Sequence, residues 1–143
     1  MSRVIGVDYG DTRIGLAISD SLGLTARPLE VVAPDRFRDR ITELIGEYEV
    51  ETVVVGLPRP LGGGESASTA GARALGEQLE GLGVEVVYVD ERFTSRMAES
   101  ALLESGMKRR QRRATVDKVA AAIILQSYLD GNFPPQGDVE DHQ

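Results

Sequence analysis

Apolar residues in the first part of the chain alternate with polar turns in a pattern that predicts three strands. Residues 3–9 and 14–19 are rich in apolar and β-branched side chains, and Gly10-Asp11-Thr12-Arg13 between them is typical of a turn. Residues 26–33 predict a third strand, which Pro34 ends. Because short turns join these strands, we expect them to be antiparallel.

Helical and strand patterns alternate in the middle of the chain. Residues 37–48 carry apolar side chains at helical spacing, and Asp35 is placed to cap this helix. Short apolar runs at 52–55 and 84–89 predict strands buried on both faces. An Ala-rich helix over residues 67–82, which Gly83 ends, lies between them.

The last third of the chain predicts two helices separated by a basic segment. Residues 95–105 have helical spacing, whereas residues 106–113 lack apolar periodicity and predict a loop. Residues 115–129 carry the strongest helical pattern, with Thr115 as N-cap. The segment 131–143 has two prolines and little to bury, and predicts a disordered tail.

The order of these elements predicts an α/β fold. Three antiparallel strands followed by two parallel strands give a five-stranded mixed sheet with helices on both faces. The length of 143 residues suits a single domain, which we expect over residues 1–130 with the tail after it.

Composition restricts the chemistry to carboxylates. The chain has no Cys, and its single His, His142, is next to the C-terminus, which argues against disulfides, thiolate sites and a Ser-His-Asp triad. No apolar run approaches about 20 residues, and the N-terminus enters a strand pattern instead of a signal peptide. We therefore expect a cytoplasmic protein without a membrane partner.

Three carboxylates stand at positions that need an explanation. Asp8 interrupts an apolar strand, and Glu91 follows the end of a later one, where α/β sheets gather functional groups. Asp117 shares a helix face with Ala121 and Ile124. The alternatives are structural: Asp8 could begin a turn, Glu91 could be a loop acid, and Asp117 could favour a helix start.

If the three carboxylates converge, a divalent cation would remove their mutual repulsion. Carboxylate oxygens are hard ligands that suit Mg²⁺ or Mn²⁺. Two such ions about 4 Å apart form the arrangement used for phosphodiester cleavage.

Positive charge is concentrated in one segment of an acidic protein. The formal net charge is −7, yet residues 108–118 carry +5, next to Asp117. Arg92 and Arg96 likewise follow Glu91. Such a segment suits a polyanionic substrate, although a solvated loop without function is the alternative. The Gly-rich residues 56–66 lack the Lys of a phosphate-binding P-loop.

Four ordered motifs, covering about residues 3–130, resemble the YqgF family. They are Val4-Ile5-Gly6-Val7-Asp8-Tyr9-Gly10 with Arg13-Ile14-Gly15; Val54-Val55-Gly56-Leu57-Pro58; Val89-Asp90-Glu91-Arg92-Phe93-Thr94-Ser95; and Asp117-Lys118-Val119-Ala120-Ala121 with Ile124, Leu125, Gln126, Tyr128 and Leu129 beyond. Residues 59–64 depart from the polar Asn-x-x-Gly-like stretch that is common in the family.

The resemblance implies a ribonuclease H-like fold and a divalent-metal nuclease that matures the 5′ end of pre-16S ribosomal RNA in the cytoplasm. By motif match, Asp8, Glu91 and Asp117 are the expected catalytic residues and the ligands of Mg²⁺ or Mn²⁺. The residues expected to bind substrate are Arg13, Arg92, Thr94, Ser95, Arg109, Arg110, Arg112, Arg113 and Lys118.

Two other functions stay open, and a third is disfavoured. A RuvC-like Holliday junction resolvase would act on branched DNA, and single-stranded DNA is a further possible substrate. A ribosome-assembly factor could bind nucleic acid without cutting it. An actin-like phosphotransferase is disfavoured, because it needs two such lobes and 143 residues supply one. Either a monomer or a homodimer is compatible with the sequence, and a two-fold junction would suit a dimer.

Overall fold

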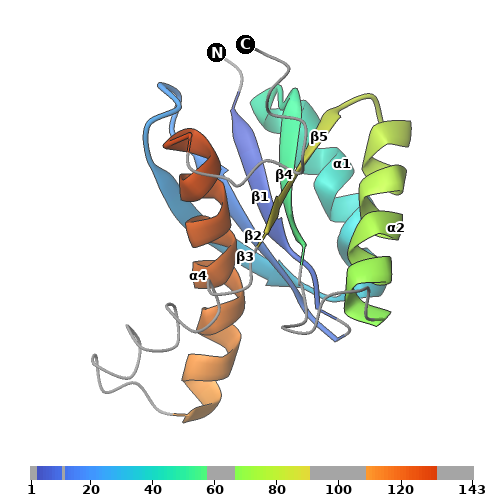
Figure 1. Cartoon of the computed structure of the whole chain (residues 1–143), viewed down its shortest axis with the longest axis vertical. Helices are drawn as coiled ribbons and strands as arrows, with labels where there is room; N and C mark the ends of the chain where they lie inside the picture. Colours follow the sequence, from blue (N-terminus) through green and yellow to red (C-terminus); the bar gives the residue numbers. More distant parts are fainter. Residues whose placement is uncertain (1–2, 11, 58–66, 91–108, 132–143) are drawn as a thin grey trace.

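Five strands form one mixed sheet with helices on both faces (Figure 1). The computed structural model describes residues 3–10, 12–57, 67–90 and 109–131, with the backbone alone for 67–68, 90 and 109–117. The strands are β1 (Val4–Asp8), β2 (Ile14–Ser19), β3 (Ala26–Val32), β4 (Thr52–Leu57) and β5 (Glu85–Asp90). The helices are the 3-10 turn η1 (Pro34–Arg36), α1 (Phe37–Tyr48), α2 (Ala67–Gly81) and α4 (Arg109–Leu129).

The strand order is β3-β2-β1-β4-β5, with β1 in the centre. β1 and β2 pair antiparallel, as do β2 and β3, whereas β1, β4 and β5 are parallel. The predicted mixed sheet is thus confirmed. Its consequence is that β1, β4 and β5 end at the same edge, which we call the carboxyl edge.

The two faces of the sheet carry separate cores. α1 and α2 cover one face, and α4 covers the other (Figure 1). Ile5 and Val7 of β1 belong to the core beneath α1 and α2. Because side chains alternate along a strand, Gly6 and Asp8 lie on the α4 face. There Ala17, Val54 and Val89 of the sheet, among others, pack with α4.

The helix ends differ from the sequence predictions in two places. Asp35 lies within η1, and no side chain caps α1, so the predicted Asp35 cap is wrong. α4 begins at Arg109, which makes residues 109–113 helical and places Thr115 inside the helix instead of at its N-cap. Arg and Gln are good helix formers, and this propensity extends the helix without apolar periodicity. Residues 58–66 of the Gly-rich segment, the predicted helix over 95–105 and the predicted tail from residue 132 on lie outside the described residues.

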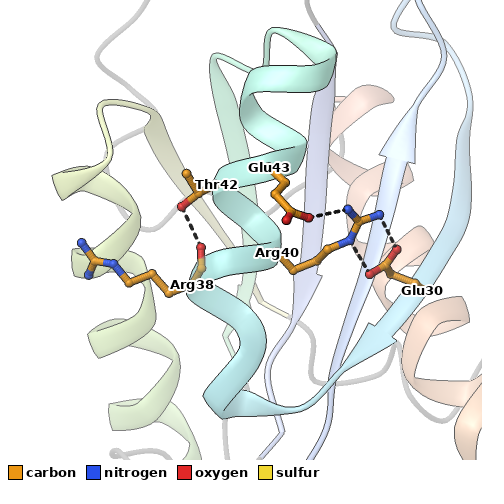
Figure 2. Close-up of polar contacts among 5 residues, drawn as sticks. All are labelled: Glu30, Arg38, Arg40, Thr42 and Glu43. Carbon is orange, nitrogen blue, oxygen red and sulfur yellow. Dashed lines mark hydrogen bonds and ion pairs between the residues drawn. The ribbon is translucent and has the colours of Figure 1, made fainter.

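Arg40 joins α1 to the edge strand β3. Its guanidinium donates from Nε and Nη2 to the two carboxylate oxygens of Glu30, at 2.7 and 2.9 Å, and from Nη1 to Glu43 Oε1 at 2.9 Å (Figure 2). The hydrogen bonds to Glu30 raise the pKa of Arg40. Because about a third of each of the Arg40 and Glu30 side chains is exposed, this pair stabilises the fold by at most about 1 kcal/mol.

Gln126 fastens the end of α4 to the turn between β2 and β3. Its Oε1 accepts a hydrogen bond from Ala26 N at 2.8 Å, and its Nε2 donates to Leu24 O at 2.9 Å. Leu24 N in turn donates to Asp20 Oδ1 at 2.8 Å, which lowers the pKa of Asp20. Because β3 begins at Ala26, these contacts hold the carboxyl end of α4 at the edge opposite Asp8.

No helix in the described ranges is long and apolar enough to cross a membrane.

Gln126→Leu is expected to lower the free energy of unfolding by about 0.5–1.5 kcal/mol, because Ala26 N and Leu24 O lose their protein partner at a partly exposed site. Urea denaturation measures the change. Gln78→Leu, on the exposed side of α2, is the matched control and should have little effect. Equal losses in the two variants would contradict the role given to Gln126.

Candidate active site at the carboxyl edge of the sheet

Asp8 is the last residue of the central strand, and its carboxylate is buried. Only 9% of the residue is exposed. It pairs with Gly15 on β2 and lies on the face of the sheet that α4 covers. Burying a carboxylate is costly unless it is paired, hydrogen-bonded or metal-bound. Asp8 interacts with other groups of the protein, so its position is supported within the fold.

Gly6 allows α4 to approach β1 closely. A Cβ placed on Gly6 would lie 2.7 Å from Leu125 Cβ and 2.9 Å from Ala121 O, closer than real side chains permit. A glycine inside a strand often marks such an approach of another backbone. The helix therefore rests directly on the strand that carries Asp8.

The direction of α4 places Asp117 toward Asp8. Gln126 contacts Ala26 at the far edge, and Ala121 lies over Gly6 in the middle of β1, so earlier residues of α4 lie toward the carboxyl edge. Figure 1 shows α4 running opposite to β1. Asp117 is four residues, about 6 Å along the helix axis, before Ala121. Asp8 is two strand positions, about 6.6 Å, beyond Gly6. The backbone of Asp117 thus reaches the level of Asp8.

The amino end of α4 brings basic residues to this edge. Arg109, Arg110, Arg112 and Arg113 all lie in its first turns, which contain no acidic residue. Lys118, one residue after Asp117, is half-buried. Arg13, also half-buried, precedes β2 at the same edge and interacts with other groups of the protein.

The remaining predicted site residues follow β5. Asp90 ends β5 opposite Leu57 of β4, at the carboxyl edge. Glu91, Arg92, Thr94 and Ser95 come next in the sequence and lie outside the described residues. Among the side chains that the structure describes, no group of three His, Cys, Asp or Glu could hold a metal ion.

The role of Gly6 in the close approach of α4 to β1 was not predicted from the sequence. The signal was present, because a glycine in an apolar strand weakens the strand unless a close approach needs it. The partner of Gly6 could not be read from the pattern, since α4 is far away in the sequence.

Comparison with known proteins identifies the family. The RuvX family, described as Holliday junction resolvase, matches residues 2–131. The chain belongs to the RuvX family. This is the YqgF family that the four motifs predict, and that prediction is confirmed.

Curated relatives of this RuvX chain carry the name "Putative pre-16S rRNA nuclease". The protein of Lactococcus lactis subsp. cremoris (strain MG1363) is 40% identical over 137 residues, which cover 92% of this chain and 96% of the relative. The protein of Listeria innocua serovar 6a (strain ATCC BAA-680 / CLIP 11262) is 43% identical over 134 residues, covering 90% and 97%.

Solved structures confirm the fold. T. thermophilus RuvC in complex with a Holliday junction substrate has a TM-score of 0.54 at 23% identity, covering 94% of this chain and 99% of that one. Fowlpox virus resolvase, in complex with Holliday junction DNA, has a TM-score of 0.54 at 12% identity, covering 90% and 97%. RuvC has a ribonuclease H-like fold, so the predicted fold class is confirmed.

Gly6→Ala is expected to lower the free energy of unfolding by about 1–3 kcal/mol, because the added methyl group would force α4 away from β1. Chemical denaturation gives the value. Gly46→Ala is the control, since a Cβ there meets nothing within 4 Å and alanine favours the helix. A Gly6→Ala protein as stable as the parent would disprove the close approach.

Proposed function

We propose that this RuvX protein is a divalent-metal-dependent nuclease that processes the 5′ end of pre-16S ribosomal RNA in the cytoplasm. The observation that carries the proposal is Asp8, a buried carboxylate at the end of the central strand, at the same level as the backbone of Asp117. The names of the curated relatives support ribosomal RNA as the substrate.

The proposed metal ligands are Asp8, Glu91 and Asp117. Their carboxylates are the hard oxygen donors that Mg²⁺ and Mn²⁺ prefer, and the buried Asp8 offers such a donor at the edge where β5 leads to Glu91. When bound, such ions activate water and stabilise the leaving oxygen in phosphodiester hydrolysis. The rigid sheet would hold the Asp8 carboxylate in place, and the contact at Gly6 would keep Asp117 near it.

Basic residues would hold the phosphate backbone beside these carboxylates. Residues 108–118 carry +5 although the whole chain carries −7. The described part of this segment is helical from Arg109, so its arginines occupy one helix end at the carboxyl edge. We assign phosphate contacts to this end of α4 and to Arg13, together with Arg92, Thr94 and Ser95 after Glu91. Because such contacts displace counterions, binding should weaken as salt rises.

Cleavage of branched DNA is the second candidate. The family description favours it, as do the solved resolvase complexes with Holliday junctions. A two-fold junction would require two copies of the site, which a homodimer supplies and a monomer does not.

Asp8→Asn should reduce metal-dependent cleavage by more than the roughly 10–100-fold that follows loss of a group that only orients a metal ligand. Thermal stability should change little, because asparagine keeps the shape of the side chain and one of its two acceptor oxygens. The matched control is Asp20→Asn at the opposite edge, which should cleave normally. If Asp8→Asn cleaves as well as the parent, the site assignment is wrong.

The substrate can be decided by one set of parallel assays with Mg²⁺ and with Mn²⁺. We expect cleavage of an RNA that carries the 5′ precursor sequence of 16S ribosomal RNA. Cleavage of a four-way DNA junction alone would select the resolvase instead. Binding without cleavage of RNA, single-stranded DNA or the junction would mean that the protein is a binding factor.

A further inference from the structure

Tyr9 follows Asp8 directly and points to the opposite face of the sheet. Its ring packs against the core beneath α1 and α2 and contacts α2 at Gly71. A Cβ on Gly71 would lie 2.6 Å from both Cε2 and Oη of Tyr9. The absence of a side chain at Gly71 therefore creates the space that the tyrosine ring occupies.

The last residue of β1 has a register partner on one side only. Asp8 pairs with Gly15 on β2, but the last pair between β1 and β4 is Val7 with Val55. Asp8 is thus beyond the ladder on the β4 side. α2 packs over β4 and β5, so the contact between Tyr9 and Gly71 fixes the chain just beyond the last pair between β1 and β4.

A second contact of the same kind lies on the same helix, over β5, which is two strands from β1. A Cβ on Gly76 would clash with the hydroxyl of Tyr88, which is in β5. The Tyr88 ring also lies near Arg73, with the guanidinium carbon 5.7 Å from the ring centroid. Two tyrosines therefore pack between α2 and the sheet. Of these two, only Tyr9 is next to a proposed metal ligand in the sequence.

We propose that Tyr9 is a positioning residue that aims the Asp8 carboxylate at the divalent metal. By locking the backbone just after Asp8 against α2, the ring limits the directions in which the carboxylate can lie on the α4 face. This inference rests on the proposed metal-dependent function. It adds Tyr9 and Gly71 to the residues on which metal affinity depends, although neither would touch the ion.

The test is Mn²⁺ binding by isothermal titration calorimetry with the full chain, without substrate. Tyr9→Leu removes the ring, and Gly71→Ala displaces it, so each should weaken Mn²⁺ binding by roughly tenfold. Tyr9→Phe keeps the ring and should bind Mn²⁺ like the wild type. Circular dichroism checks that each variant is folded.

Gly76→Ala is the matched control, because it disturbs the other tyrosine contact of the same helix. It should lower the melting temperature about as much as Gly71→Ala and leave Mn²⁺ affinity unchanged. Wild-type affinity in both Tyr9→Leu and Gly71→Ala, or an equal loss in Gly76→Ala, overturns the positioning role alone. Absence of saturable Mn²⁺ binding by the wild type overturns the metal-dependent function itself.

Discussion

The close packing of α4 on β1 at Gly6 is the contact on which the arrangement of the site depends. A methyl group at Gly6 would collide with both Ala121 O and Leu125 Cβ, so the helix can lie this close only because glycine has no side chain. Near the carboxyl end of α4, Gln126 holds the helix against the turn between β2 and β3. These two contacts together set both the height and the direction of the helix relative to Asp8.

The sheet topology then determines which parts of the chain meet. Because β1, β4 and β5 pair in parallel, their last residues lie at one edge of the sheet. These residues are Asp8, Leu57 and Asp90. Because α4 runs opposite to β1, its basic amino end reaches the same edge (Figure 1). Residues far apart in the sequence are thus gathered by strand direction and one helix contact.

Much of the fold could be predicted from local pattern, and less of the site. The bounds of β2 were predicted to the residue, and the apolar face of α1 was recognised, since a continuous apolar strand and an apolar helix stripe are local signals. The start of α4 was not, because Arg109–Arg113 favour a helix by propensity and show no periodicity. Asp8 stood out as a charge in an apolar strand. The contacts of Gly6 and Gly71 are tertiary, and no local pattern shows them.

The positive charges at the amino end of α4 lower the stability of the helix there. Arg109 is three and four positions from Arg112 and Arg113, the spacings at which like charges on a helix repel each other. The helix dipole also disfavours cations at this end. Counterions or phosphates near these arginines would relieve both effects. The stability of the helical conformation in these first turns should therefore depend on ionic strength. A polyanion that binds there would stabilise the helix end to which it binds.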